Sequence, residues 1–578
     1  MAPADQLQEV KIMLHGTAAS EGIGIGKVML IEEHSLEYTP RTVTDTEAES
    51  QRFKVAVDAF CYNTEKQAEN LRSSAGEKEA EILAGHIQII KDPYLSGEIE
   101  KLIADGQCAE SALEHMCDMF IAMFSAADDE LTKQRAADVR DIKSGVLGIL
   151  LGVNEIKVSD APKGTVLVAR ELTPSVTAGI VKENIAGIIT ETGGTTSHSA
   201  ILARALEIPA VLSVEGVASS LKNGDTVVVD GSEGAVIVNP DDNTVAEYSK
   251  KRDAFLAERK ELENYRGRET KSASGEVYEL FCNIGKPEDA VKAVDADGEG
   301  VGLFRTEFLF MDRTSIPTED EQFEAYKKAA LILKGKSLII RTLDIGGDKD
   351  IPYLGLEKEE NPFMGFRAIR YCLKNRELFK SQIKAILRAS AFGDIKIMFP
   401  LITTMDELRE GKKLVAECKA DLHNMGINFN ENIQVGVMVE TASAAIIADM
   451  LAKEADFFSI GTNDLTGYTM ACDRGNNDVS YLYSPLQPSV LRMIKRTIEC
   501  GVQNGISVGM CGEAAANKLM IPLLISFGLT EFSVSAPSVL NVRKIISTWT
   551  KEEADKVTAK VLEMSTQQEI VEYLKSVV

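Results

Sequence analysis

The sequence predicts an α/β multidomain protein, in which an α/β domain with an inserted helical bundle is followed by a C-terminal (β/α)8 barrel. Strand signals near the N-terminus are interrupted by a long stretch of helical apolar spacing and then return. After them, eight short apolar runs alternate with amphipathic segments, which is the pattern of a (β/α)8 barrel. The chain has 578 residues, of which 44% are hydrophobic and 26% are charged, so it can bury several cores.

The chain is strongly acidic. Its 63 Lys and Arg residues against 88 Asp and Glu residues give a net charge of −25. This argues against a nucleic-acid or anionic-membrane partner and allows a basic protein partner. No apolar run approaches the ~20 residues that a membrane span needs, and the N-terminus lacks the features of a signal peptide. Nine cysteines without a CxxC pair favour reduced thiols, so we expect a cytoplasmic protein.

The α/β domain is expected at 1–36 and 148–244, with the helical bundle at 37–147. The bundle segment contains little proline and repeats its apolar side chains at helical spacing. The simplest topology places the first strand in the same domain as the later ones, so that the bundle is an insertion. The later strand signals are Thr165–Ala169, Ala186–Thr190, Ala210–Ser213, Thr226–Asp230 and Ala235–Asn239.

The segment 245–269 mixes Glu, Lys and Arg at helical spacing and has few apolar anchors, which predicts a solvated helical linker. The barrel is expected over 270–578. Its predicted strands are Tyr278–Cys282, Gly300–Phe304, Leu338–Arg341, Ile395–Phe399, Val435–Val439, Phe457–Ile460, Ser507–Met510 and Phe532–Val534.

Polar side chains follow most of the predicted barrel strands. Because the C-terminal ends of barrel strands meet at one face, these side chains are expected to line one mouth. Several cations there require an anionic ligand, since guanidinium groups pair with carboxylate and phosphate. Glu440 and Asp464 follow adjacent strands and are hard oxygen ligands suited to Mg²⁺. We therefore expect a small phosphorylated acid, bound with Mg²⁺ near Asn283, Arg305, Glu307, Arg341, Asp344, Lys349, Asn463 and Arg474.

Cys511 has two interpretations. A buried cysteine is usually a small packing residue. At a strand end that faces the mouth, next to Glu513, its thiol could instead deliver a proton to a developing carbanion or enolate, and we favour this role. The other eight cysteines are assigned to packing.

A second candidate site is the segment TETGGTTSHSAILARALEIPAV at 190–211. A strand leads into two glycines, three hydroxyl residues and His198, and an amphipathic helix follows, whose first N–H groups favour a phosphate. His198 can act there as a nucleophile toward phosphorus while a hydroxyl fixes its tautomer. The alternative is a capping histidine without chemistry. The expected supporting residues are Thr196, Ser197 and Arg204.

His86 lies in a predicted bundle helix. A hydrogen-bonded histidine on a helix face is the default interpretation. Contact with a partner protein is the alternative, because Glu77, Glu79 and Glu81 make the start of that helix acidic.

These motifs together resemble one family. GGTTSHS, GLFRTEFLFMDR, RTLDIGGDKD, ENPFMGFRAIR, GTNDLTGYTMACDRGN and CGEAAA occur in the family's order, and the match covers essentially the whole chain. The chain resembles enzyme I of the bacterial sugar phosphotransferase system, the phosphoenolpyruvate–protein phosphotransferases. It departs from the family pattern at Ala442, where proline is usual, and at Gly467, where glutamine is usual.

The resemblance implies a two-step phosphoryl transfer, from phosphoenolpyruvate to His198 and then to a histidine of the phosphocarrier protein HPr, with release of pyruvate. This is the first step of sugar uptake by that system. It also implies that Glu440 and Asp464 bind Mg²⁺ and that Cys511 protonates C3 of the enolate. The bundle would dock HPr, the linker would let the α/β domain swivel, and the barrel would form a homodimer. The implied substrate-binding residues are Arg305, Arg341, Lys349, Arg367, Asn463, Asp464 and Arg474.

Two other functions fit parts of the pattern. A dikinase or synthase that makes phosphoenolpyruvate from ATP shares the GGxTSH motif, but it needs a nucleotide-binding domain for which no segment is free. A paralogue that binds a carrier protein without turnover is disfavoured because Arg305, Arg341, Glu440, Asp464 and Cys511 are all present.

Overall fold

The computed structural model describes residues 12–31, 36–74, 77–126, 130–153, 158–172, 174–177, 180–194, 197–311, 313–346 and 351–578. The chain divides into two compact units, residues 1–259 and residues 260–578. Within the described ranges, no helix combines the length and the apolar character needed to cross a membrane.

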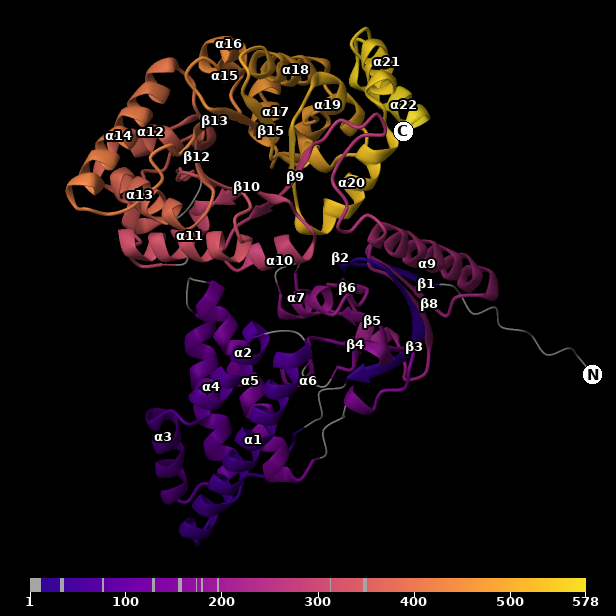
Figure 1. The fold of residues 1–578 in the computed structure, drawn as a ribbon. Coiled ribbons are helices and arrows are strands. Elements are labelled where there is room, and N and C mark those ends of the chain that lie inside the picture. Colours follow the sequence, from indigo (N-terminus) through magenta and orange to yellow (C-terminus); the bar gives the residue numbers. More distant parts are fainter. Residues whose placement is uncertain are drawn as a thin grey trace, which may run out of the picture. The chain divides into compact units, whose positions relative to one another are not determined.

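The first unit is built on an eight-stranded sheet in the order β1-β8-β7-β3-β4-β5-β6-β2 (Figure 1). β3 pairs parallel to β4 and antiparallel to β7, so the strand before the bundle and the strands after it share one sheet. This confirms the predicted α/β fold with inserted helices. The strands are β1 (Ile12–His15), β2 (Thr17–Ser20), β3 (Ile23–Ile31), β4 (Thr165–Ala169), β5 (Ile185–Thr190), β6 (Ala210–Leu212), β7 (Thr226–Asp230) and β8 (Ala235–Val238).

One short segment covers both edges of this sheet. β1 pairs with β8 and β2 pairs with β6, and only Gly16 lies between the two strands. The Gly16 N–H donates to the carbonyl of Gly234 at 2.9 Å, and a Cβ at Gly16 would lie 2.4 Å from the carbonyl oxygen of Leu212. A larger residue therefore does not fit without a shift of the backbone. The sequence did not predict β1 and β2, because four-residue strands are too short to show a clear alternation.

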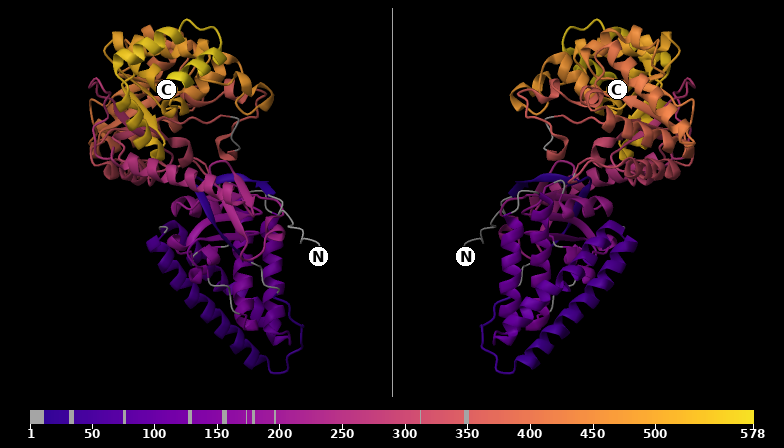
Figure 2. Two further views of the ribbon diagram at one scale, coloured as in Figure 1. Left: turned by 90° about the vertical axis from the view of Figure 1, so that its right-hand side faces the viewer. Right: turned by 90° about the vertical axis from the view of Figure 1, so that its left-hand side faces the viewer.

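Helices α1 to α5 are inserted in the sequence between β3 and β4, and they pack alongside one another (Figure 2). Their apolar faces meet in one core that includes Phe53, Ile99, Leu113, Ile142 and Val146, all of them buried. The helices are α1 (Thr46–Ser74), α2 (Glu77–Ile90), α3 (Pro93–Ala104), α4 (Ala109–Ser125) and α5 (Glu130–Leu151). The other helices that begin in this unit are α6 (Pro174–Thr177), α7 (His198–Ala205), α8 (Val217–Ser220) and α9 (Asp242–Glu263), the last of which overlaps the predicted linker.

The second unit is a closed barrel of eight strands, β9 to β16, in which every neighbouring pair is parallel (Figure 1). This confirms the predicted (β/α)8 barrel, and each predicted strand agrees with the observed one to within two residues. The strands are β9 (Glu279–Ile284), β10 (Gly300–Arg305), β11 (Leu338–Arg341), β12 (Ile395–Phe399), β13 (Val435–Val439), β14 (Phe457–Ile460), β15 (Ser507–Met510) and β16 (Glu531–Val534).

Helices surround the barrel strands, because each connection between parallel neighbours must cross from one end of the barrel to the other. They are α10 (Asp289–Asp295), α11 (Glu319–Leu333), α12 (Ala368–Lys374), α13 (Arg376–Ala389), α14 (Met405–Asn424), α15 (Ala442–Ile446), α16 (Ala448–Leu451), α17 (Thr462–Met470), α18 (Pro488–Gln503), α19 (Ile521–Phe527), α20 (Val539–Thr548), α21 (Lys551–Val561) and α22 (Gln567–Val577).

The barrel interior contains a buried carboxyl group, that of Glu531 on β16. Its Oε1 has no hydrogen-bond partner among the described residues. A Cβ at Gly302 or Gly509 would lie 2.4 or 2.8 Å from this atom, so these two glycines make room for the side chain. Burial, and then the carboxylate of Glu279, raises the pKa of Glu531 to about 8, although Lys396 acts in the opposite direction.

Candidate active site

Side chains singled out in the sequence gather at the C-terminal ends of the barrel strands. Arg305 and Arg341 are the last residues of β10 and β11, and Glu440 and Cys511 directly follow β13 and β15. Asp464 lies in the first turn of α17, which follows β14. Because all eight strands are parallel, their C-terminal ends bring these side chains to one mouth.

Arg341 is buried and forms two ion pairs. Its Nη2 lies 2.7 Å from Oε1 of Glu307, and its Nη1 lies 2.8 Å from Oδ2 of Asp344. Burial disfavours the charged guanidinium, but the carboxylates of Glu307 and Asp344 outweigh this and raise the pKa of Arg341 above its usual value. Its buried Nε has no hydrogen-bond partner among the described residues. The side chain therefore stays cationic and retains one unused donor.

Asp344 joins Arg341 to a second buried arginine, Arg367. Oδ1 of Asp344 lies 2.7 Å from Nη2 of Arg367, and the same Nη2 lies 3.3 Å from Oδ2 of Asp464. Burial opposes the charge on Arg367, but the carboxylates of Asp344 and Asp464 raise its pKa. The sequence placed Asp344 and Glu307 at the mouth but did not predict that they pair with these arginines. Their signal was an acidic residue two or three positions after a strand-end arginine, in RTEF and RTLD.

Glu440 and Asp464 are the candidate metal ligands. Glu440 is buried, and its Oε1 accepts a hydrogen bond from the N–H of Leu401 at 2.6 Å. Burial, and then the neighbouring carboxylates of Asp464 and Asp344, raises the pKa of Glu440 to about 8. Carboxylates that lie this close repel one another unless more positive charge is added. The carboxylate oxygens of Glu440 and Asp464 therefore suit a divalent cation.

The two carboxylates alone do not complete a metal site. In the described part of the chain, no three or more His, Cys, Asp and Glu side chains are grouped to hold a metal ion. Mg²⁺ commonly takes one or two carboxylates and completes its shell with substrate oxygens and water, which suits this pair.

Gly461 makes the space for the Glu440 side chain. A Cβ at Gly461 would lie 2.8 Å from Oε2 of Glu440 and 2.9 Å from its Cβ. The φ of Gly461 is −85°, which other residues adopt without strain, so the requirement for glycine here is one of space.

Cys511 is buried and carries a thiol rather than a thiolate. Its Sγ lies 3.8 Å from the carbonyl oxygen of Ile460. Burial raises the pKa of Cys511 to about 11, although Arg341 and Arg305 lie near enough to oppose the shift. The thiol therefore keeps its proton at neutral pH, as a proton donor at the mouth would have to do.

Asn463 forms two hydrogen bonds with Glu513, which lies two residues after Cys511. Its Nδ2 donates to Oε1 of Glu513 at 3.4 Å, and the N–H of Glu513 donates back to Oδ1 of Asn463 at 3.4 Å. The hydroxyl of Tyr483 donates to the carbonyl of Asn463 at 3.0 Å. These contacts tie the start of α17 to the segment after β15.

The remaining cations of the predicted pocket differ in their surroundings. Arg305 is half-buried and forms no ion pair with another described residue. Arg474 and Arg367 lie against the same ring, with their guanidinium carbons 6.0 and 5.7 Å from the ring centre of Phe363. Lys349 lies outside the described residues.

The predicted phosphate-binding loop of the first unit follows β5. Gly193 has a φ of +105°, which favours glycine, and its carbonyl accepts a hydrogen bond from Oγ of Ser213 at 2.6 Å. His198 is the first residue of α7, and Ser197 is the N-cap, with its Oγ accepting from the N–H of Ala200 at 3.3 Å. The capping position is therefore held by serine and not by histidine.

The other residues expected to support His198 are only partly described. Nη1 of Arg204, in the last turn of α7, donates to the carbonyl of Ala19 at 3.1 Å, which ties the helix to β2. Thr195, Thr196 and the side chain of His198 lie outside the described part of the structure.

His86 is buried between two bundle helices. Its Nε2 lies 3.4 Å from Oδ1 of Asp138 and its Nδ1 lies 3.7 Å from Oδ2 of Asp141, both on α5. This geometry favours the packing interpretation over a direct contact with a partner protein.

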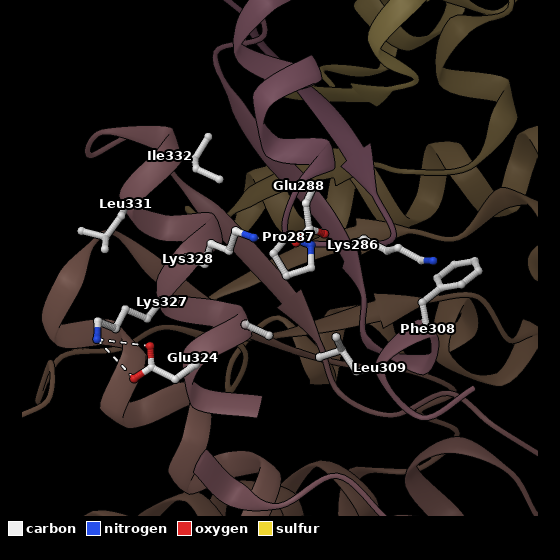
Figure 3. A pocket seen from close by; sticks show the side chains of 11 residues that line it. Lys286, Pro287, Glu288, Phe308, Leu309, Glu324, Lys327, Lys328, Leu331 and Ile332 are labelled. Atoms are coloured by element: carbon white, nitrogen blue, oxygen red, sulfur yellow. Dashed lines mark hydrogen bonds and ion pairs between the residues drawn. The ribbon is translucent and has the colours of Figure 1, made fainter. Parts of the chain in front are cut away.

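A hollow of about 860 Å³ opens in the second unit between the start of α10, the turn after β10 and α11 (Figure 3). Two of its lysines are already paired, Lys327 with Glu324 at 3.2 Å and Lys328 with Glu288 at 2.7 Å. Its wall includes Phe308 but none of the substrate, metal or proton-donor residues predicted from the sequence. It is therefore distinct from the mouth.

Three family descriptions match the chain. "PEP-utilising enzyme, N-terminal" matches residues 15–135, "PEP-utilising enzyme, mobile domain" matches residues 161–234, and "PEP-utilising enzyme, PEP-binding domain" matches residues 259–550. Among solved structures, an NMR structure of enzyme I (nEIt) is 37% identical and covers 42% of this chain and 99% of that chain, with a TM-score of 0.38.

Curated relatives align over nearly the whole chain. A phosphoenolpyruvate-protein phosphotransferase of Bacillus subtilis (strain 168) is 46% identical over 98% of this chain and 99% of its own length. A phosphoenolpyruvate-protein phosphotransferase of Listeria innocua serovar 6a is 45% identical over 97% of this chain and 98% of its own length. The chain therefore belongs to the family of phosphoenolpyruvate-protein phosphotransferases, the enzymes I.

Proposed function

We propose that the chain transfers the phosphoryl group of phosphoenolpyruvate to His198 and then to a histidine of HPr, releasing pyruvate, as the first step of sugar uptake by the phosphotransferase system. The observation that carries this proposal is the barrel mouth, where Arg341 and Arg367 are buried, held by Asp344 and set beside Glu440. A pocket of this kind binds a small, multiply charged anion.

The phosphate and carboxylate of the substrate would be bound by the guanidinium groups. Arg305 has no carboxylate partner among the described residues, and Arg341 retains an unused Nε, so both can donate to substrate oxygens without losing an existing bond. Arg367 contacts Asp464, and Arg474 lies against the same Phe363 ring as Arg367. We propose that both, together with Asn463, also bind the substrate, and Lys349 is proposed to join them from the resemblance alone.

Glu440 and Asp464 would hold Mg²⁺, which when bound would neutralise charge on the phosphate oxygens. Metal binding also accounts for an otherwise costly arrangement, the crowding of buried carboxylates that raises the pKa of Glu440. Asp344 remains free of this role, because both of its oxygens face guanidinium groups.

The proposed chemistry uses two side chains of the chain itself. A ring nitrogen of His198 attacks phosphorus in line, the bond from phosphorus to the enol oxygen breaks with its electron pair left on that oxygen, and the enolate of pyruvate remains in the mouth. The Cys511 thiol then gives its proton to C3, which yields pyruvate and a thiolate that regains a proton from solvent. The raised pKa of Cys511 supports this role, because the proton is present at neutral pH.

We propose that HPr docks on an apolar stripe of the bundle. Met119 and Met123 lie four residues apart on α4 and are exposed, as is Tyr94 on α3. The Tyr94 ring lies 6.3 Å from that of Phe120, which joins the two helices into one surface. Large apolar side chains left exposed in this way are typical of a protein-binding site.

The homodimer through the barrel is proposed from the resemblance. A cytoplasmic location is proposed because all nine cysteines are unpaired and eight of them are buried, which suits a reducing compartment.

The deciding experiment is labelling with phosphoenolpyruvate that carries ³²P. The wild-type chain should become labelled in the presence of Mg²⁺ and release pyruvate, whereas His198→Ala should not be labelled. Mass spectrometry of the wild-type chain should place the label on His198. Label that persists in His198→Ala would show that another residue accepts the phosphoryl group.

A further inference from the structure

Gln382 on α13 makes three buried hydrogen bonds that converge on the strand ends beneath the mouth. Its Oε1 accepts from the N–H of Leu343 at 2.9 Å. Its Nε2 donates to Oγ1 of Thr306 at 3.2 Å and to the hydroxyl of Tyr326 at 3.2 Å. Gln382, Thr306 and Tyr326 are all fully buried, so each bond is made in a low dielectric and would be costly to leave unmade.

These bonds fix the backbone just after each of the two strand-end arginines. Thr306 follows Arg305 directly, and Oγ1 of Thr306 donates to the carbonyl of Arg341 itself at 2.8 Å. Leu343 comes two residues after Arg341. A single amide side chain therefore holds the exit of β10 and the exit of β11 at once.

The ladder between β10 and β11 is irregular just before these exits. β10 and β11 pair in parallel with Arg305 opposite Arg341, but the register shifts between Val301 and Phe304, just before the mouth. Such an irregularity locally disrupts the ladder. The bonds of Gln382 add a second constraint, from outside the sheet, on the spacing of the two ends.

We propose that Gln382 is a positioning residue for phosphoenolpyruvate, which sets the separation of Arg305 and Arg341 to match the substrate. This rests on the proposed function, in which those two arginines bind the substrate. Gln382 does not touch the substrate and acts only through the backbone that carries the guanidinium groups. Its loss should weaken substrate binding, which the loss of a buried amide away from the strand ends should not do.

The same buried network offers a matched control. Gln322 on α11 is also fully buried, and its Nε2 donates to the carbonyl of Pro317 at 3.1 Å. Its Oε1 accepts from the hydroxyl of Tyr326 at 3.3 Å. Gln322 thus shares one partner with Gln382 but has no bond to either strand end, so it reports the cost of losing a buried amide alone.

The test compares Gln382→Leu with Gln322→Leu in the full chain. Initial rates of ³²P labelling are measured against phosphoenolpyruvate concentration with Mg²⁺ in excess, and the thermal midpoint of each variant is measured alongside. We expect both variants to melt earlier than the wild type. Only Gln382→Leu should raise the half-saturating phosphoenolpyruvate concentration, by about tenfold, the effect of about 1.4 kcal/mol. Equal shifts in the two variants, or no shift in Gln382→Leu, would overturn the proposal.

A second pair of variants keeps the test decisive if Gln382→Leu does not fold. Thr306→Ser keeps the hydroxyl that links Gln382 to the Arg341 carbonyl, and Thr306→Val removes it at similar volume. Thr306→Val should raise the half-saturating concentration and Thr306→Ser should restore it, and equal values in the two would overturn the proposal. The wild-type labelling separates the outcomes, because an unlabelled wild type would refute the proposed function itself.

Discussion

The charges at the barrel mouth are shared among neighbours and do not form isolated pairs. Asp344 accepts from both Arg341 and Arg367, while Arg341 also contacts Glu307. Removing one partner from such a buried set leaves the others unpaired, which costs more than the loss of a surface ion pair. The guanidinium groups are therefore held in place without a ligand, and the proposed binding of substrate would cost little side-chain entropy.

The buried carboxyl of Glu531 leads to a prediction about pH. Its pKa is about 8 in the folded chain and near ~4.3 when unfolded. The folded state therefore holds a proton that the unfolded state releases between these values. The stability that this group contributes is fully present below pH ~4.3 and is lost as the pH rises toward 8, at up to about 1.4 kcal/mol per pH unit.

Glu531→Gln removes this dependence, because an amide does not titrate. The difference in thermal midpoint between Glu531→Gln and the wild type should thus grow in favour of the variant from pH 5 to pH 8. Differential scanning calorimetry at unit steps of pH measures it. A constant difference over that range would mean that Glu531 is ionised throughout.

At the residue scale, the sequence predicted which side chains would reach the mouth but not how they are bonded. Strand-end positions follow from the apolar runs, so the places of Arg305, Arg341, Glu440 and Cys511 could be deduced. The bond between Thr306 and Gln382 joins residues 76 positions apart. No local pattern in the sequence reports a contact of that range.

At the scale of elements, the start of α17 requires a residue without a side chain. Its N-cap, Gly461, lies against the side chain of Glu440, which directly follows the neighbouring strand β13. The close approach of this loop to β13 is thus what allows a carboxylate to turn into the mouth.

Gly461→Ala should displace the Glu440 carboxylate, since the added Cβ would lie 2.8 Å from Oε2. We expect at least a tenfold higher Mg²⁺ requirement for labelling, by analogy with the 10–100-fold losses that follow disturbance of metal-ligand supports. The measurement is the labelling rate against Mg²⁺ concentration. Gly467→Ala, in the same helix, is the control, because the nearest atom to its Cβ is 3.3 Å away and is no part of the site. An unchanged Mg²⁺ requirement in Gly461→Ala would argue against Glu440 as a ligand.

Elements were predicted best where their pattern was long or repeated. The eight barrel strands were found because each is a continuous apolar run flanked by helices, the mark of a parallel sheet buried on both faces. β1 and β2 were missed because each has only four residues and because their pairing partners, β8 and β6, lie at least 190 residues away. Their identity as strands is set by those partners.

On the scale of the whole molecule, each buried core of described residues belongs to one of the two units. The clusters centred on the α/β sheet and the bundle use described residues from 19 to 238, and the clusters of the barrel use described residues from 278 to 574. No cluster of described residues draws on both units, so each unit has the means to fold by itself.

Calorimetry of the full chain should accordingly show two transitions. In the His198→Ala background, which prevents turnover, Mg²⁺ with phosphoenolpyruvate should raise only the barrel transition. At a ligand concentration of 100 times Kd the gain in stability is about 2.7 kcal/mol. Glu440→Gln in the same background serves as the control and should lose most of the shift. A single transition that moves as a whole would show that the units unfold together.

The double pairing of residues 12–20 has a practical consequence. One segment pairs with β8 at one edge of the sheet and with β6 at the other. Removal of the residues up to 20 would therefore expose two strand edges at once. Exposed strand edges can pair with the edges of other chains, which leads to aggregation. The N-terminal strands thus protect the whole sheet from self-association, and shortened versions of this protein should begin before Ile12.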